Sequence, residues 1–126
     1  MPYTLHSIQD TITFTRLKAG FWATLDGNRC KSELDLHREL AAVLRFPDHY
    51  GLNFDAMYDC LTDLEWLGAD SIWLFITHPS LICSERNNHA EELFKEVLRS
   101  TLETYRNHPV HFHLVSEKAY LQFLTH

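Results

Sequence analysis

The chain has 126 residues, of which 45% are apolar and 22% are charged, with only four Gly and four Pro. This length and composition suit a single folded domain and exclude a collagen-like, linker-dominated or disordered chain. No apolar run, including that of residues 72–76, is long enough to span a membrane. Because the first residues also lack the pattern of a signal peptide, we expect a cytoplasmic protein.

The net charge of −6 is concentrated in one part of the chain. Residues 46–85 contain seven acidic residues and no Lys or Arg, whereas the rest of the chain has eleven basic and ten acidic residues. The acidic balance disfavours a nucleic-acid binder that uses a basic surface. A local negative field attracts a cationic partner over a Debye length, although many charge runs are merely solvated surfaces.

Residue patterns in the first half predict two strands and two helices. Alternating apolar residues predict strands over 11–17 and 21–25. Ser32, followed by an acid three residues later, is a predicted N-cap, and the helix that it starts ends before Pro47. Asn53 is the predicted N-cap of the second helix. The apolar stripe of this second helix comprises Met57, Cys60, Leu61 and Leu64.

The second half continues the alternation of strands and helices. Residues 72–76 are apolar on both faces of a strand, which is typical of a central position in a sheet. A long helix is predicted from Asn88, then a strand over 110–114 and a short helix capped by Ser116. The residues of these two helices expected to face the core are Leu93, Phe94, Val97, Leu98, Thr101 and Tyr105, then Ala119, Tyr120, Phe123 and Leu124.

These elements predict an α/β fold with one small, mainly parallel sheet flanked by helices. We expect the strand over 11–17 to be added antiparallel at an edge of the sheet. Three cysteines, Cys30, Cys60 and Cys83, lie far apart without a Cys-x-x-Cys pair, so reduced thiols are expected.

The second helix carries an acidic and aromatic stripe opposite its apolar one. Asp55, Tyr58, Asp59 and Thr62 recur at helical spacing, with Asp63 beside them. Like-charged pairs one turn apart cost a few tenths of a kcal/mol each, and no basic residue lies nearby in the sequence to offset them. A cation from outside, either a metal or the Arg and Lys groups of another protein, would relieve this repulsion. The preceding loop adds His49, Tyr50, Asn53 and Phe54, and such aromatic residues favour a protein interface over an ion site.

The segments Ser-Glu-Leu-Asp-Leu-His-Arg-Glu-Leu at 32–40 and Phe-Pro-Asp-His-Tyr-Gly-Leu-Asn-Phe-Asp-Ala-Met-Tyr-Asp-Cys-Leu-Thr at 46–62 resemble the barstar family of intracellular ribonuclease inhibitors. The resemblance is close over 32–64 and follows the order of elements over 21–115. We therefore expect one domain over 1–126, in which 1–20 is an extension with an extra β segment and 116–126 is a C-terminal helix.

The resemblance implies a non-enzymatic inhibitor that needs no cofactor, is a monomer when unbound, and blocks the active site of a basic ribonuclease as an antitoxin or immunity-type protein. Asp59 matches the central inhibitory acid of the family and Asp55 its supporting acid, whereas Glu103 is the expected acid from the late helix. His49 stands where the archetype has Tyr, and Tyr58 where it has Trp, so the partner can differ. The expected partner-binding residues are His49, Tyr50, Gly51, Asn53, Phe54, Asp55, Tyr58, Asp59, Thr62, Asp63 and Glu103.

Two other interpretations remain open on the sequence alone. A metal-dependent hydrolase could use Asp55 and Asp59, or His111 and His113, which share one face of a predicted strand. No phosphate-binding glycine loop and no complete ligand set accompany either pair, so protein recognition ranks first. A structural interaction module is the third interpretation.

Overall fold

The computed structural model describes residues 2–8, 20–85 and 89–125. Its strands are β1 (Tyr3–Ser7), β2 (Phe21–Asp26), β3 (Ser71–Thr77) and β4 (His111–Ser116). Its helices are α2 (Glu33–Val43), α3 (Phe54–Asp63), α4 (Ala90–Tyr105) and α5 (Lys118–Leu124), with 3-10 turns η2 (Gly27–Arg29), η3 (Glu65–Leu67) and η4 (Pro79–Leu81). None of the helices in these ranges is long and apolar enough to cross a membrane.

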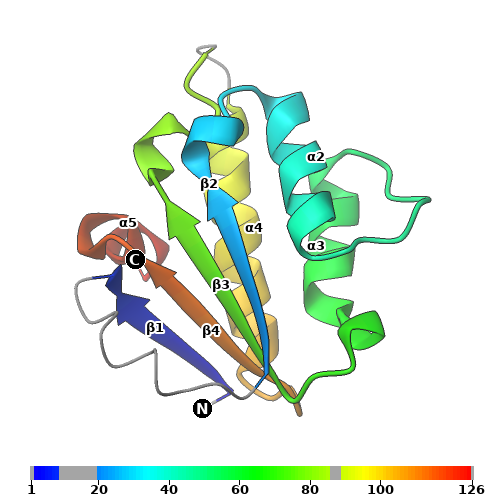
Figure 1. The fold of residues 1–126 in the computed structure, drawn as a ribbon. Helices are drawn as coiled ribbons and strands as arrows, with labels where there is room; N and C mark the ends of the chain where they lie inside the picture. The colour runs from blue at the N-terminus through cyan, green and yellow to red at the C-terminus, as the bar shows by residue number, and fades with distance from the viewer. Residues whose placement is uncertain (1, 9–19, 86–88, 126) are drawn as a thin grey trace.

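The four strands form one sheet in the order β1-β4-β3-β2, and every strand pair is parallel. The predicted α/β class with a mainly parallel sheet is therefore confirmed. The chain moves in one direction across the sheet from β2 to β3 to β4, so right-handed crossovers place α2, α3 and α4 on the same face. Figure 1 shows this arrangement, with α4 behind the sheet and α3 beside it.

The core fills the space between the inner face of the sheet and these helices. Successive residues of a strand point to opposite faces, so one alternate set from each strand is buried here. The sheet contributes Ala23, Leu25, Ile72, Leu74, Ile76, Phe112 and Leu114, and the helices contribute Leu36, Leu40, Met57, Leu61, Phe94, Leu98, Leu102 and Tyr105.

Local capping signals in the sequence located two helix starts correctly. The Ser32 hydroxyl accepts the amide of Asp35 at 3.1 Å, and the Asn53 side chain accepts the amide of Ala56 at 2.8 Å. The strand predicted over 72–76 is β3, which lies between β4 and β2 as expected of a central strand.

Two expectations fall outside the described residues, and a third is wrong. The predicted strand over 11–17 and the Asn88 start of the long helix lie outside the described residues. The antiparallel pairing expected of residues 11–17 stays a prediction, and the edge strand that the structure places beside β4 is β1, which is parallel to it. Ser116 does not cap α5, because it is the last residue of β4 and its buried hydroxyl donates to the Ile76 carbonyl at 2.7 Å.

Three side chains expected in the core are exposed. These are Leu93 on α4 and Ala119 and Phe123 on α5. The Phe123 ring is covered on one side by the Lys95 ammonium, 4.4 Å from the ring centroid, so it packs on the surface of α4. Leu93 lies in a groove that is described below.

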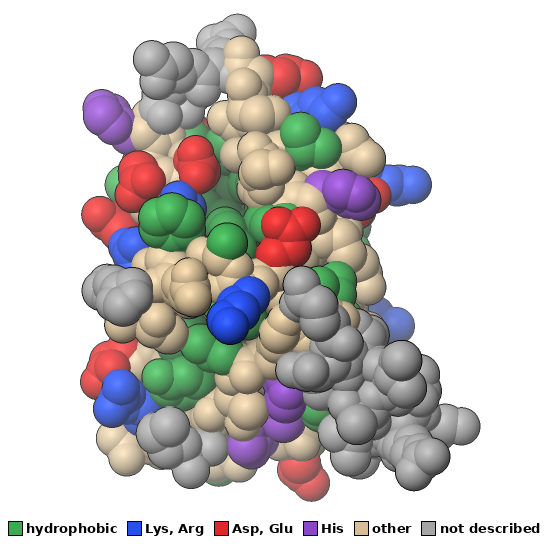
Figure 2. All heavy atoms as spheres, turned by 90° about the vertical axis from the view of Figure 1, so that its left-hand side faces the viewer, with side chains coloured by type: hydrophobic (Ala, Val, Ile, Leu, Met, Phe, Trp, Pro, Cys, Tyr) green, Lys and Arg blue, Asp and Glu red, His purple; other side chains and the backbone are tan. Residues whose placement is uncertain are grey.

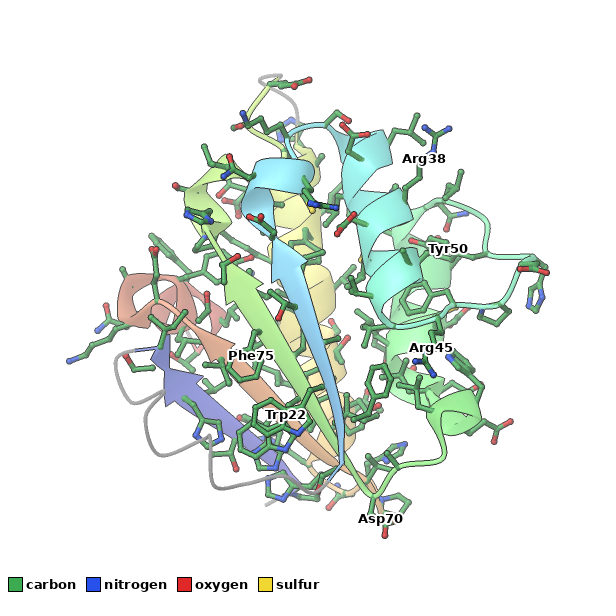
Figure 3. The ribbon with its side chains drawn as sticks, viewed as in Figure 1. Trp22, Arg38, Arg45, Tyr50, Asp70 and Phe75 are labelled. Carbon is green, nitrogen blue, oxygen red and sulfur yellow. The ribbon has the colours of Figure 1, made fainter. Side chains whose placement is uncertain are left out.

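The outer face of the sheet carries a row of stacked rings. Trp22, Trp73 and His113 stack across β2, β3 and β4, with centroids 4.9 Å and 3.7 Å apart, and Phe75 lies beside Trp22 (Figure 3). His6 of β1 is hydrogen-bonded to His113 at 3.0 Å. Burial, together with the smaller effects of the neighbouring His111 and His6, lowers the pKa of His113 to about 4.

We predict that this ring stack makes the protein less stable in acid. A lowered pKa means that the unfolded chain binds a proton before the folded chain does, so stability is lost as the pH falls from the unfolded value of about 6.5 toward 4. His113 should account for about 1–2 kcal/mol of that loss after allowance for solvent screening. Urea unfolding at pH 7.5 and 4.5 measures it. A His113→Gln variant should show a smaller difference between the two pH values, and an equal difference would contradict the assignment.

Candidate protein-docking site

The N-terminal half of α3 presents two carboxylates to solvent. Asp55 and Asp59 are exposed and lie one helical turn apart, whereas Met57 and Leu61 on the opposite face are buried in the core. Asn53 fixes the start of this helix, because its amide group also donates to the Gly51 carbonyl at 3.2 Å while its oxygen caps the first turn. The cap therefore sets the positions of both carboxylates.

A groove of about 490 Å³ runs between α3 and α4. A third carboxylate, Glu96 of α4, lines it together with Asp55 and Asp59, so acids from two helices converge on one concave surface. The remaining lining residues are Phe54, Tyr58, Leu93, Val97 and Ser100. Leu93 is 42% exposed, which gives the groove an apolar surface next to its carboxylates.

Two tyrosines link α3 and α4 through hydrogen bonds. The Tyr58 hydroxyl is hydrogen-bonded to the Thr104 hydroxyl at 2.7 Å. The buried Tyr105 hydroxyl donates to the Leu61 carbonyl at 2.8 Å. These bonds fix the axial register of the two parallel helices, and therefore which acid of α4 faces Asp55 and Asp59.

The carboxylates of the groove have no cationic partner within the described residues. The ion pairs found there involve Glu33, Asp26, Glu91, Glu92 and Glu103, none of which lines the groove. Asp55 at the helix N-terminus is favoured by the helix dipole, but Asp59 lies a turn further on and gains less. The groove is therefore a region of uncompensated negative charge.

The loop before α3 is anchored from inside by Tyr50. Its hydroxyl donates to Nδ1 of the buried His37 at 2.6 Å, and Nε2 of the same imidazole donates to Glu33 at 3.3 Å. Burial lowers the pKa of His37, which suits a neutral ring with this pair of partners. Phe46 packs edge-on against the Tyr50 ring, and Figure 3 shows Tyr50 beside α2.

The structure brings some of the expected partner-binding residues together and separates others. Phe54, Asp55, Tyr58 and Asp59 share the groove. His49 and Gly51 are exposed in the loop, whereas the Tyr50 hydroxyl and the Asn53 side chain are engaged within the protein.

The last three expected residues lie outside the groove. The Thr62 hydroxyl donates to the Tyr58 carbonyl at 2.8 Å, and Asp63 accepts the amide of Glu65 at 3.3 Å. Glu103 pairs with Arg106 at 3.0 Å and lines a separate pocket beside Tyr3, so the structure does not bring it to Asp55 and Asp59. Glu96, which the sequence analysis did not name, is the acid of α4 that lines the groove.

The metal alternative gains no support from the geometry. The rings of His111 and His113 stack in parallel at 4.1 Å, so their nitrogen atoms do not converge on a common point. His111 is hydrogen-bonded to the Thr4 hydroxyl, and His113 is bonded to His6. Across the part of the chain that the structure describes, no three His, Cys, Asp or Glu side chains are grouped to hold an ion.

The chain is thus an α/β domain with an acidic, partly apolar groove between two of its helices. The chain belongs to the Barstar family, described as "Barstar (barnase inhibitor)", which it matches over residues 21–117. The members of this family are inhibitors and not enzymes. A Bacillus subtilis (strain 168) protein named "Putative ribonuclease inhibitor YrdF" is 47% identical over 38 residues, which cover 30% of this chain and 42% of that protein.

We predict that the buried contact of Tyr50 stabilises the protein more than the similar contact of Tyr58. Tyr50→Phe leaves Nδ1 of a buried imidazole without a donor and should lower the free energy of unfolding by about 1–3 kcal/mol. Tyr58→Phe removes the same hydroxyl from a less buried pair and should cost about 0.5–1.5 kcal/mol. Urea unfolding of both variants at pH 7.5 compares them. A larger loss for Tyr58→Phe would mean that the Tyr50 contact does not hold the loop.

Proposed function

We propose that the protein is an antitoxin or immunity-type inhibitor that docks the groove between α3 and α4 onto the active site of a basic ribonuclease. The observation that carries this proposal is the convergence of Asp55, Asp59 and Glu96 on one exposed groove without a described cation beside them. Membership of the Barstar family and the likeness to a protein named as a ribonuclease inhibitor support it.

The chemistry of the groove suits the phosphate-binding site of a nuclease. Such a site holds Arg, Lys and His groups around the position of an RNA phosphate, and carboxylates can accept charge-assisted hydrogen bonds from the same groups. Asp59 lies in the middle of the exposed face of α3, with Asp55 one turn before it and Glu96 across the groove. In the proposed complex, Asp59 enters the phosphate site and the other two acids pair with cations at its edge.

The apolar part of the groove contributes in a different way. Phe54, Leu93 and Val97 lie next to the carboxylates, and burial of these side chains against the nuclease would exclude water from the charged contacts. Exclusion of water strengthens an ion pair because the effective dielectric constant falls. His49 and Gly51 in the exposed loop would contact the rim of the same site, while Tyr50 holds that loop in position.

Capture of the partner tests the proposal. Immobilised protein is exposed to lysate of the source organism, and bound proteins are identified by mass spectrometry and assayed for ribonuclease activity. Barnase, which the family description names, is titrated with the free protein as a second probe. We expect a basic ribonuclease whose activity is abolished at one inhibitor per enzyme. Capture of no ribonuclease, together with undiminished barnase activity, would refute the proposal.

We predict that the two acids at positions 59 and 63 differ in their effect on inhibition. Asp59→Ala leaves cations of the nuclease buried and unpaired, so it should weaken binding by at least about 2 kcal/mol, mainly through faster dissociation. Asp63 lies outside the groove and accepts a hydrogen bond from the Glu65 amide, so Asp63→Ala should weaken binding much less than Asp59→Ala does. Inhibition titrations and stopped-flow kinetics measure both, with thermal melts to confirm folding. Undiminished inhibition by Asp59→Ala would show that the docking register is wrong.

We also predict that association with the nuclease depends strongly on salt. The uncompensated charge of the groove steers a cationic partner only over the Debye length, which falls from roughly 30 Å at 0.01 M to about 3 Å at 1 M ionic strength. The association rate constant should fall at least about tenfold across this range, and the dissociation rate much less. Stopped-flow mixing in increasing NaCl measures both rates. The Asp59→Ala, Glu96→Gln double variant should show a shallower dependence, whereas an unchanged slope would place the docking surface elsewhere.

A further inference from the structure

Two cysteines from distant parts of the chain lie side by side where β2 and β3 end. Cys30 directly follows η2, and Cys83 lies two residues after η4. The backbone amide of Cys83 donates to the Cys30 carbonyl at 2.7 Å, and the amide of Glu85 donates to the Lys31 carbonyl at 2.9 Å. The two loops are thus joined by a short ladder of backbone hydrogen bonds beyond the ends of the strands.

This ladder brings the cysteines within disulfide range. With standard backbone bond lengths, a hydrogen bond of 2.7 Å limits the separation of the two Cα atoms to at most about 6.6 Å. Disulfides span Cα separations of about 4.4–6.8 Å. Both side chains belong to one apolar cluster, where Cys30 is 0% and Cys83 is 6% exposed. The third cysteine, Cys60, lies on α3, away from this pair of loops.

The electrostatics of the two thiols agree with this proximity. Burial raises the pKa of Cys30 to about 12, and the charges of Glu39 and then Cys83 contribute in the same direction. Burial also raises the pKa of Cys83 to about 11. Both groups are therefore protonated thiols at neutral pH, which makes them slow to react while the loops stay closed.

The backbone at Cys83 adopts a conformation that directs its amide toward Cys30. Its φ angle is +57°, in the left-handed region that Gly and Asn adopt more readily than Cys. Cys83 occupies this position and uses the same turn to direct its amide at Cys30.

We propose that Cys30 and Cys83 form a reversible disulfide when the protein meets a small-molecule disulfide such as oxidised glutathione. Cys83, the less buried of the two, loses its proton and attacks one sulfur of the oxidant, which releases one thiolate and leaves a mixed disulfide. Cys30 then loses its proton and attacks the Cys83 sulfur, which releases the second thiolate. Two electrons pass to the oxidant, whose two thiolates take up the two protons. A dithiol reductant reverses the reaction.

The crosslink would close a loop of chain that contains the α3 side of the proposed docking site, while the α4 side, with Glu96, lies outside the loop. Residues 30–83 include α2, the loop before α3, α3 and β3. A bond across so long a loop restricts the unfolded chain, so the oxidised form should unfold at a higher temperature. Because the native backbone already holds the two residues together, formation of the bond requires only a transient opening of the η4 loop and not refolding.

Thiol mapping of the folded protein tests this inference, which does not depend on ribonuclease binding. The parent is incubated with oxidised glutathione at pH 8, alkylated, digested and examined by mass spectrometry. We expect a peptide pair linked through Cys30 and Cys83, an alkylated Cys60, and an intact mass lower by two hydrogens before alkylation. The melting temperature should rise by at least about 5 °C and return to its starting value with dithiothreitol.

Matched variants make the result specific. Cys60→Ser should oxidise like the parent, whereas Cys30→Ser should stop at a mixed disulfide of Cys83 with glutathione. Three outcomes would overturn the proposal: alkylation of Cys30 and Cys83 in the folded parent after oxidation, a link from either of them to Cys60, or a lower melting temperature for the oxidised form. The main measurement is made on the parent protein, so the proposal can be tested even if one variant does not fold.

Discussion

The handedness of parallel crossovers is the constraint on which the acidic groove depends. Each connection between parallel neighbours must pass over one face of the sheet, and because β2, β3 and β4 follow one another in the same direction, both crossovers use the same face. Helix α3 from the first crossover and α4 from the second then lie next to each other and run parallel. A carboxylate from each crossover can therefore face the same groove, although the two are far apart in the sequence.

The arrangement of acids in the groove conflicts with local stability. Asp55 and Asp59 repel each other at helical spacing, and a basic residue at either neighbouring turn would relieve the repulsion. The surrounding structure offsets this cost through contacts that leave the carboxylates free: the Asn53 cap, the bond between Tyr105 and Leu61, and the core face of α3. The opposite side of the molecule differs, because Lys and Arg side chains are interspersed with acidic ones around β1 and α5 (Figure 2).

Local signals in the sequence predicted the elements that depend on local chemistry. Ser32 and Asn53 cap helices through bonds to residues three positions away, and β3 is apolar on both faces because it is central, so both patterns are visible in a short window. Strand β1 was not predicted, because apolar and polar residues alternate only weakly over residues 3–7. The segment is defined as a strand by its pairing with β4. Phe123 was assigned to the core by its helical spacing, but it lies at the surface, where it contacts Lys95 of another helix.

A sequence pattern could not predict which acid of α4 lines the groove. Glu96 and Glu103 are seven residues apart, or about two helical turns, so they point in nearly the same direction from the axis and no helical pattern distinguishes them. The choice between them depends on how far α4 slides along α3, and the bond from Tyr58 to Thr104 fixes that register. With that bond in place, Glu96 faces Asp55 and Asp59 while Glu103 is left to pair with Arg106. The packing of the two helices also determines the role of Leu93. This exposed residue lies three positions before Glu96 and contributes to the apolar part of the groove. The charge of the site is thus visible in the sequence, but its shape is determined by the packing of α3 on α4.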